Sequence, residues 1–425
     1  MSAIDLASTA PESGIRMRSV YRTCAVIGLG GLFAGITGPL ISTFLPPLVQ
    51  RVLGDHRTAI GFVMAIDNVL LLLLVPWAGP ASDRAVQRGR GRLRFVLGGY
   101  FLAAAGMVLL PTLATGLLPL LAAIVILNVG INVQRAPFQA LVADVVPSRW
   151  RSLGTASVTF QMCVGAIVFL MLGRVLGMRP AFLIAAGSVV VVAGAFALWL
   201  REPATSAASD AVTYRALGRA VGAALRGDIP AVRPIFAATL LLQLTFQTFT
   251  TWYALHGTER FGVRPEDVTT GFIAWALGGV IGALPAGWLG VRLGRRRAML
   301  IGFALMAACF LALDRVASVQ QAVPLLALAS ASWTFPLVNA YPLFVEPVPA
   351  EHRGVLGALY VLCGALGGAI GDPLNGGLFD LFGGYRPLFL MMAGYTALAV
   401  VAVLLVPRGT GEAARPDTTS RQEGS

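Results

Sequence analysis

The segment Gln134–Arg151, QRAPFQALVADVVPSRWR, is repeated in part in the second half of the chain. Its last residues, DVVPSRWR from Asp144, return as EPVPAEHR from Glu346, at an offset of 202 residues. The acid, the proline three positions later and the final Arg (Arg151 and Arg353) are in register. Each copy follows a long apolar segment and precedes another. A repeat of this length in an apolar chain predicts two homologous membrane halves with a path between them.

The composition excludes a soluble domain. Of 425 residues, 56% are hydrophobic and only 12% charged, and the mean hydropathy is +0.77. These values predict an all-α polytopic membrane protein. All 32 basic residues are Arg, and most of them lie in loops between apolar segments, where such residues orient helices in a membrane. We therefore expect the net charge of +12 to reflect contact with a lipid bilayer, and we expect no nucleic-acid partner.

Few residues of the chain are suited to metal binding or catalysis. The four Cys lie in apolar segments without a CxxC pattern, which predicts free thiols. Only three His are present, and no catalytic set of Ser, His and Asp and no nucleotide loop is found. We expect no enzyme, no metal and no cofactor.

Apolar segments of about 20 residues recur twelve times. The predicted spans are 24–49, 58–80, 93–114, 117–142, 153–175, 180–200, 233–256, 267–290, 297–314, 322–345, 354–378 and 385–406. They define a six-helix half at 1–200 and a second at 233–406. A cytoplasmic linker at 201–232 and a disordered cytoplasmic tail at 407–425 complete the chain.

The Arg distribution predicts the orientation. Of the 32 Arg, 23 lie on the side of the N-terminus, eight on the other side, and Arg135 inside a span. The positive-inside rule then places both termini in the cytoplasm, with the protein in the inner (plasma) membrane. In the linker, Tyr214, Leu217 and Leu225 share one helical face with Val221, which favours a helix lying on the membrane surface. The alternative is a solvated connector.

Two further loops repeat between the halves. Gly79–Arg84, GPASDR, precedes RGRGR at 88–92, and the second half has Gly287–Arg297, GWLGVRLGRRR. Both resemble the GxxxDRxGRR loop of the major facilitator superfamily, which implies that fold, with twelve helices in two six-helix halves. Glycine permits close helix approach, and Asp and Arg can hold helix ends at the cytoplasmic gate. Val291 stands where the pattern has Asp, so we expect the first copy to form the stronger electrostatic contact. The predicted gating residues are Gly79, Asp83, Arg84, Asp144, Arg151, Arg292, Glu346, Arg353 and Asp372.

A finer resemblance covers residues 30–160. The motifs MAIDN at 64–68, PWAG at 76–79, RAP at 135–137 and ALVAD at 140–144 resemble the sucrose/proton symporter-like branch, near the glycoside–pentoside–hexuronide:cation symporters. This resemblance implies cation-coupled transport of a sugar or glycoside. The cation-binding Asp of the melibiose-type symporters would fall at Val75, so sodium coupling at that position is not expected.

Four polar residues, Asn128, Asn132, Arg135 and Gln139, form one stripe along the predicted span 117–142. Such a stripe cannot face lipid, so it faces protein or water. It predicts either a cavity wall that binds a hydroxylated substrate or polar contacts between helices. Arg135 could instead extend toward Asp144 or the membrane interface.

Asp67 lies near the middle of its span, where a carboxyl that binds and releases a proton would serve proton coupling. The alternative is a permanently paired structural Asp. Arg135 is the obvious partner, but the predicted depths of the two residues differ by about 13 Å, more than an Arg side chain covers.

The second half contributes further polar and aromatic candidates. Trp252 and Tyr253 predict either substrate stacking or, preferably, an interfacial aromatic belt. Asp372 lies toward the outer end of a glycine-rich span, as a gate residue or a hydrated one. The remaining predicted substrate-binding residues are Gln161, Gln243, Gln247, Trp275, Trp333 and Asn339.

These observations favour a monomeric secondary transporter that moves a sugar or glycoside together with protons by alternating access. The alternatives are an efflux antiporter for drugs or metabolites and a membrane sensor that binds a sugar without moving it.

Overall fold

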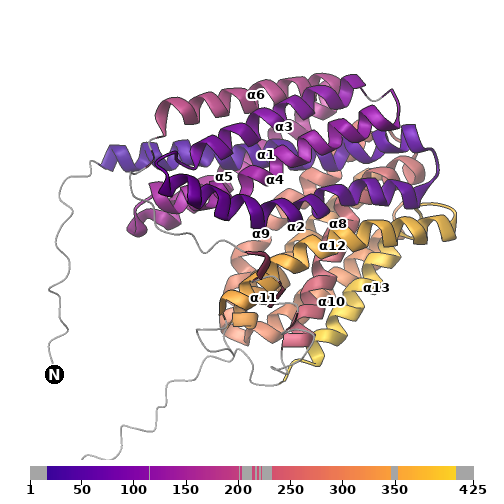
Figure 1. The fold of residues 1–425 in the computed structure, drawn as a ribbon. Coiled ribbons are helices and arrows are strands. Elements are labelled where there is room, and N and C mark those ends of the chain that lie inside the picture. The colour runs from indigo at the N-terminus through magenta and orange to yellow at the C-terminus, as the bar shows by residue number, and fades with distance from the viewer. Residues whose placement is uncertain are drawn as a thin grey trace, which may run out of the picture.

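The computed structural model describes residues 17–113, 115–200, 202, 213–215, 218–219, 222, 232–345 and 353–407. Within these ranges the chain is helical and has no strand (Figure 1). Glu346 and the predicted tail beyond Pro407 lie outside the described residues, as does most of the linker. Of the expected surface helix, Tyr214 and four nearby residues are helical, and the Tyr214 hydroxyl donates a hydrogen bond to the carbonyl of Leu73.

Twelve long helices occupy the described part of the chain, as the apolar segments predict. The first six are α1 (Met17–Leu53), α2 (Arg57–Gln87), α3 (Leu93–Leu113), α4 (Leu117–Val145), α5 (Arg151–Leu176) and α6 (Met178–Trp199). The other six are α8 (Val232–Phe261), α9 (Pro265–Leu293), α10 (Arg295–Leu313), α11 (Val319–Val345), α12 (Arg353–Phe382) and α13 (Leu388–Leu404). Several helices extend beyond the predicted span by up to seven residues, because helices continue past the hydrocarbon core that sets the apolar length.

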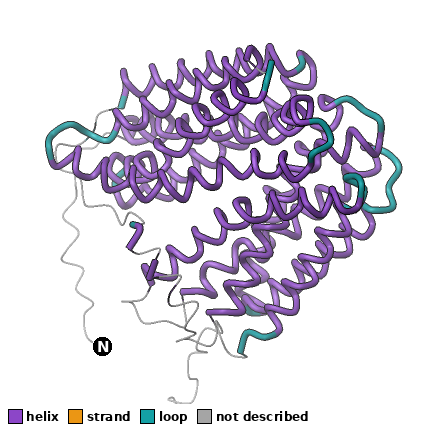
Figure 2. Tube along the Cα trace, turned by 45° about the vertical axis from the view of Figure 1, so that its right-hand side comes forward, coloured by secondary structure: helices purple, strands orange, loops and turns teal. Residues whose placement is uncertain are grey.

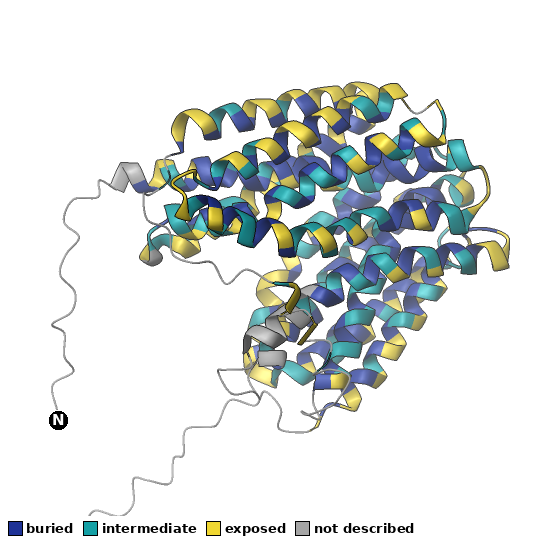
Figure 3. Ribbon diagram, in the orientation of Figure 1, coloured by how far each residue is buried: buried dark blue, intermediate teal, exposed yellow. Residues whose placement is uncertain are grey.

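Most of these helices suit a bilayer. Nine described helices are long and apolar enough to cross a membrane, and α13 is apolar with 17 residues. Large apolar side chains such as Leu118 and Leu284 are exposed. Exposed residues follow the outer faces of the helices, while the buried residues lie between helices (Figure 3). An exposed apolar surface of this extent is stable only against lipid. The prediction of an all-α polytopic membrane fold is confirmed.

The helices form two groups, α1–α6 and α8–α13, that meet at one end and diverge at the other (Figures 1 and 2). The groups touch through α2 with α12, α5 with α9, and α1 with α8 and α9. We call the end where α2 begins and α12 ends the closed end. The opposite end, where α1 begins, is the open end.

The closed end depends on glycines between α2 and α12. A Cβ on Gly61 would collide with the backbone carbonyl of Asp372, and a Cβ on Gly376 would collide with that of Arg57. Deeper in the same contact, Gly368 leaves room for the amide of Asn68. Backbone and amide groups of the two helices therefore approach to distances that only glycine permits.

Gly61→Ala should open the closed end, because overpacking of about 1 kcal/mol shifts a two-state equilibrium about fivefold. The measurement is the labelling rate of Thr58→Cys, which is half-buried at this contact, in purified protein without the four native cysteines. Gly187→Ala in α6, where an added Cβ meets nothing within 4 Å, is the matched control. Equal labelling in both variants would contradict the glycine contact.

Candidate functional site

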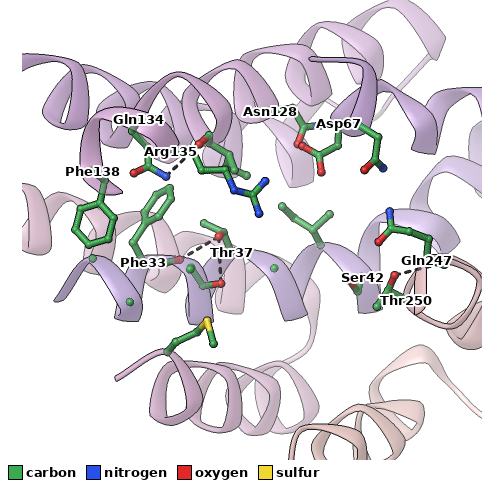
Figure 4. A pocket seen from close by; sticks show the side chains of 18 of the residues that line it. Phe33, Thr37, Ser42, Asp67, Asn128, Gln134, Arg135, Phe138, Gln247 and Thr250 are labelled. Carbon is green, nitrogen blue, oxygen red and sulfur yellow. Dashed lines mark hydrogen bonds between the residues drawn. The ribbon is translucent and has the colours of Figure 1, made fainter. Parts of the chain in front are cut away.

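A cavity of about 550 Å³ lies between the two groups of helices. Helices α1, α2 and α4 form most of its wall, and α5, α8 and α12 complete it. Phe33 and Phe138 contribute apolar surface (Figure 4). Its polar lining residues are Thr37, Ser42, Asp67, Asn68, Asn128, Gln134, Arg135, Gln139, Thr155, Gln247, Thr250, Thr251 and Asp372. The cavity thus presents amides and hydroxyls together with one cation and two acids.

The α4 stripe forms one side of this cavity. Asn128, Arg135 and Gln139 line it, whereas Asn132 is fully buried behind them. The Arg135 guanidinium points into the cavity (Figure 4) and is solvent-exposed there. Among the described residues it forms neither a hydrogen bond nor an ion pair. Arg135 therefore does not extend to Asp144 in this conformation.

Asp67 projects from α2 into the same cavity. The amide of Asn132 donates a hydrogen bond of 2.8 Å to Asp67 Oδ1, and a second contact of 3.4 Å reaches the Asp67 backbone carbonyl. No ion pair joins Asp67 to Arg135 within the described chain, as their predicted difference in depth indicated. The residue that orients Asp67 is an amide one turn from Arg135, and it leaves the acid free of a fixed positive partner.

The second group contributes fewer of the predicted binding residues to the cavity. Gln247 lines it, but Gln243 is enclosed between α8 and the glycines of α12. Trp275 and Trp333 lie in an aromatic cluster, where Trp275 stacks on Phe249 at 4.2 Å and Trp333 on Phe246 at 4.9 Å. The two Trp are not among the residues that line the cavity.

Two other predicted binding residues make helix contacts. The Gln161 amide donates to the Ala25 carbonyl at 2.9 Å, between α5 and α1. The Asn339 amide donates to the Ala286 carbonyl at 3.2 Å, between α11 and α9. Neither side chain lines the cavity, because each points along a helix–helix seam.

The preference for an interfacial belt at Trp252 and Tyr253 is wrong. Both side chains are fully buried at the closed end. Trp252 packs on Phe379 at 5.0 Å and on Tyr385 at 5.8 Å between ring centroids. Sequence position placed these aromatics correctly in depth, but α12 and α13 cover them from lipid.

Arg57 connects the two groups at the closed end. Its guanidinium lies 3.9 Å from Asp380 and 3.8 Å from Glu259, and it covers the Tyr385 ring at 5.0 Å. Asp380 also accepts hydrogen bonds from the backbone amides of Arg57 and Thr58 at 3.0 and 2.9 Å. The sequence analysis missed this cluster, which we call the Arg57 cluster. The partners are more than 200 residues from Arg57, and no motif marks them.

Arg92 organises the open end of the first group. Its side chain is buried, pairs with Asp83, and contacts Asp144 at 2.8 Å and the Ser82 hydroxyl at 3.1 Å. Burial alone would lower the pKa of Arg92, but the hydrogen bonds to the two acids hold that pKa above its usual value. The backbone amides of Arg92 and Leu93 donate to Glu202. We call this group the Arg92 cluster.

Two glycines make this arrangement possible. Gly89 and Gly91 have φ of +69° and +68°, the left-handed region that favours glycine. They turn the RGRGR loop back so that Arg92 reaches the end of α2. The cluster joins α2, α3 and α4, all in the first group. In this conformation Arg92 contacts both Asp83 and Asp144 from within the same group of helices.

The other predicted gating residues make weaker contacts. Gly79 is buried, and its carbonyl accepts a hydrogen bond from Ser82. Arg84 is exposed, and Arg151, also exposed, donates to the carbonyl of Ala143 at 3.2 Å. Arg353 begins α12, but its side chain is not described.

In the second loop copy, Arg292 lies over the Trp288 ring at 4.3 Å, and Val291 is 88% exposed. Arg296 donates to the carbonyls of Val403 and Leu404 at the end of α13. This copy fastens helix ends through backbone carbonyls, whereas the first copy uses carboxylates.

Among the described residues no group of three His, Cys, Asp or Glu is arranged to hold a metal ion. The four Cys are free, as expected.

A bundle of apolar helices with a polar cavity between two groups, closed at one end, is the architecture of a membrane transporter. The chain belongs to the Major Facilitator Superfamily, whose family model matches residues 27–275 and again 235–423. No curated protein matches the chain.

Solved structures share this fold. A bacterial homologue of the human lysosomal transporter Spinster, in an inward-facing and occupied conformation, is 15% identical with a TM-score of 0.72, over 92% of this chain and 97% of that one. The same homologue in its unoccupied inward-facing conformation is 16% identical with a TM-score of 0.66, over 92% of this chain and 95% of that one. A mutant of the nucleoside transporter NupG is 12% identical with a TM-score of 0.73, over 90% of this chain and 99% of that one.

Arg92→Leu should destabilise the fold, because removing one partner from a buried ion pair costs about 3–5 kcal/mol. The measurement is thermal unfolding of the purified protein. Arg84→Leu, which removes an exposed Arg from the same loop, is the control and should leave the melting temperature nearly unchanged. Equal melting temperatures would show that the ion pairs of Arg92 with Asp83 and Asp144 do not stabilise the fold.

Arg135→Lys should weaken solute binding about tenfold or more while leaving folding intact. Lysine keeps the charge but loses the planar guanidinium, and a charge-assisted hydrogen bond contributes about 1.5–3 kcal/mol. The measurement is affinity and initial uptake rate per amount of protein, for a sugar selected by a thermal-shift screen. Arg84→Lys serves as control, and wild-type behaviour of the Arg135 variant would remove this side chain from the binding site.

Proposed function

We propose that this transporter moves a small hydroxylated solute, a sugar or glycoside, together with protons by alternating access. The observation that carries the proposal is the cavity, where an Arg135 free of described partners and an Asp67 oriented by Asn132 face the same space. Amides of Asn128, Gln139 and Gln247 surround them. Side chains that both donate and accept hydrogen bonds match the hydroxyl groups of a sugar.

The volume supports a small solute. About 550 Å³ lies within the range of 300–1,000 Å³ that small-molecule sites occupy. The half-buried Phe138 offers a face on which the apolar side of a sugar ring can lie. The same apolar surface also supports the second candidate, an efflux antiporter for a drug or metabolite.

The orientation follows from the Arg residues. The open end is the side on which 23 of the 32 Arg lie, so we place it and both termini on the cytoplasmic side of the inner membrane. The described conformation is then inward-facing, with the Arg57 cluster on the outer side. The protein works as a monomer in this proposal, since the cavity is built within one chain.

Asp67 is the proposed coupling site. It faces the cavity, it is polarised by a neutral amide, and Arg135 lies on the adjacent wall without holding it in an ion pair. A proton on Asp67 would leave the positive charge of Arg135 available to the solute. Loss of that proton to the cytoplasm would let the two charges attract each other and favour release of the solute.

Counterflow in proteoliposomes tests the function. Exchange of labelled sugar shows a transporter, and binding without exchange would show a sensor. Uptake driven by an inward proton gradient supports a symporter, whereas extrusion under the same gradient would support the antiporter.

Asp67→Asn should abolish proton-driven accumulation and retain sugar exchange, because Asn keeps the shape and can still hydrogen-bond but cannot titrate. Both activities are measured in the same proteoliposomes. Asp314→Asn, which alters an acid at the end of α10 away from the cavity, is the control. Undiminished accumulation by the Asp67 variant would eliminate this residue as the coupling site.

A further inference from the structure

Asp372 is a carboxyl without a described partner inside the protein. It lies within α12, lines the cavity wall toward the closed end, and is 1% exposed. Thr251 and Trp252 of α8 lie beside it, yet neither of its carboxylate oxygens has a hydrogen bond of acceptable geometry. The indole nitrogen of Trp252 also has no acceptor. This arrangement suits a neutral acid, because an ionised carboxylate buried without donors is far more costly.

Among the residues that the structure describes, none offers Asp372 an available positive charge. The Arg57 guanidinium, at the start of α2, is engaged by Asp380 and Glu259. Arg135 lies on α4 and forms no ion pair with Asp372 among the described residues. From α8, the neighbours Thr251 and Trp252 carry no charge. The other charged group that acts on Asp372 is an acid, Asp67 of α2.

Asp67 and Asp372 belong to the two helices that close the protein. The Asp372 backbone carbonyl occupies the space that a side chain at Gly61 would fill. Closing α2 against α12 therefore removes Asp372 from water and brings it toward the negative charge of Asp67 in one movement. A carboxylate that is shielded from water beside the negative charge of Asp67 cannot remain ionised at low cost.

We propose that Asp372 is a second proton-binding site, separate from Asp67, and that the outer side closes only when Asp372 carries a proton. In the outward-open state α2 and α12 part, water reaches Asp372, and the carboxylate exchanges protons with the external solution. Uptake of one proton converts the carboxylate to the neutral acid, and no other bond forms or breaks. The inference rests on the proposed proton coupling and adds to it the site that makes closure depend on protons.

The experiment follows the closed end directly and needs no solute. Spin labels on Asp55→Cys and Leu381→Cys, both exposed beside the Arg57 cluster, report the distance between the two groups. The distance distribution is measured in nanodiscs from about pH 5.5 to about pH 8.5, without the four native cysteines. In the wild-type background the closed population should fall about threefold or more as pH rises.

Asp372→Asn should keep the outer side closed at every pH, since Asn is neutral and fills the same space. Asp372→Glu should restore the pH dependence, and Asp67→Asn should leave it in place but shifted toward lower pH, because the negative charge that opposes ionisation of Asp372 is gone. A wild-type distribution that does not change with pH overturns the proposal, even where the Asn variant does not fold. An Asn variant with wild-type pH dependence also overturns it and assigns the effect to His56, Glu259 or Asp380.

The proposed function can fail without this inference. A protein that exchanges no sugar, yet closes its outer side in a manner dependent on Asp372, refutes the transport proposal for sugars and supports the proton site. Conversely, sugar uptake driven by protons that persists in Asp372→Asn, together with a closed end that is insensitive to pH in the wild type, supports the transport proposal and refutes the proton site at Asp372.

Discussion

The contact between α2 and α12 is the constraint on which the described conformation depends. It brings the backbones of Gly61 and Asp372, and of Gly376 and Arg57, to distances that no side chain would permit. This approach seals one end of the molecule and leaves the cavity open toward the other. Glycine contacts lack the large side chains that would interlock the two helices, which suits the separation that the proposed alternating-access cycle requires.

Two Arg clusters at opposite ends have different consequences because of where their partners lie. The Arg92 cluster is confined to the first group of helices and centred on a buried Arg, so it stiffens that group. The Arg57 cluster joins α2 to α8 and α12 and is partly exposed, so its ion pairs stabilise the closed end only modestly. A strong contact within a group and weak contacts between groups favour movement of the groups as bodies.

The cavity keeps its charges apart. Arg135 on α4 has no described partner, Asp67 is held by an amide, and Asp372 is enclosed at the closed end. In a membrane each such residue is costly unless water, a solute or a proton compensates it. The cavity supplies water to Arg135 and Asp67, and a proton would serve for Asp372. In the proposed mechanism, the same cost that makes embedded charges rare links proton binding to the movement of helices.

The sequence alone determined the number, order and approximate limits of the helices, because apolar length and loop Arg are local properties that the bilayer itself selects. It also identified the α4 stripe, since a polar face on an apolar helix must meet protein or water. Only the tertiary structure decided which polar residues share the cavity. Gln161 and Asn339 carry the same amide chemistry as Gln139, yet they point into helix seams. The partners of Arg57 and Arg92, and the enclosure of Asp372, depend on which helices cross and how closely, and these crossings join residues far apart in the chain that no local pattern connects.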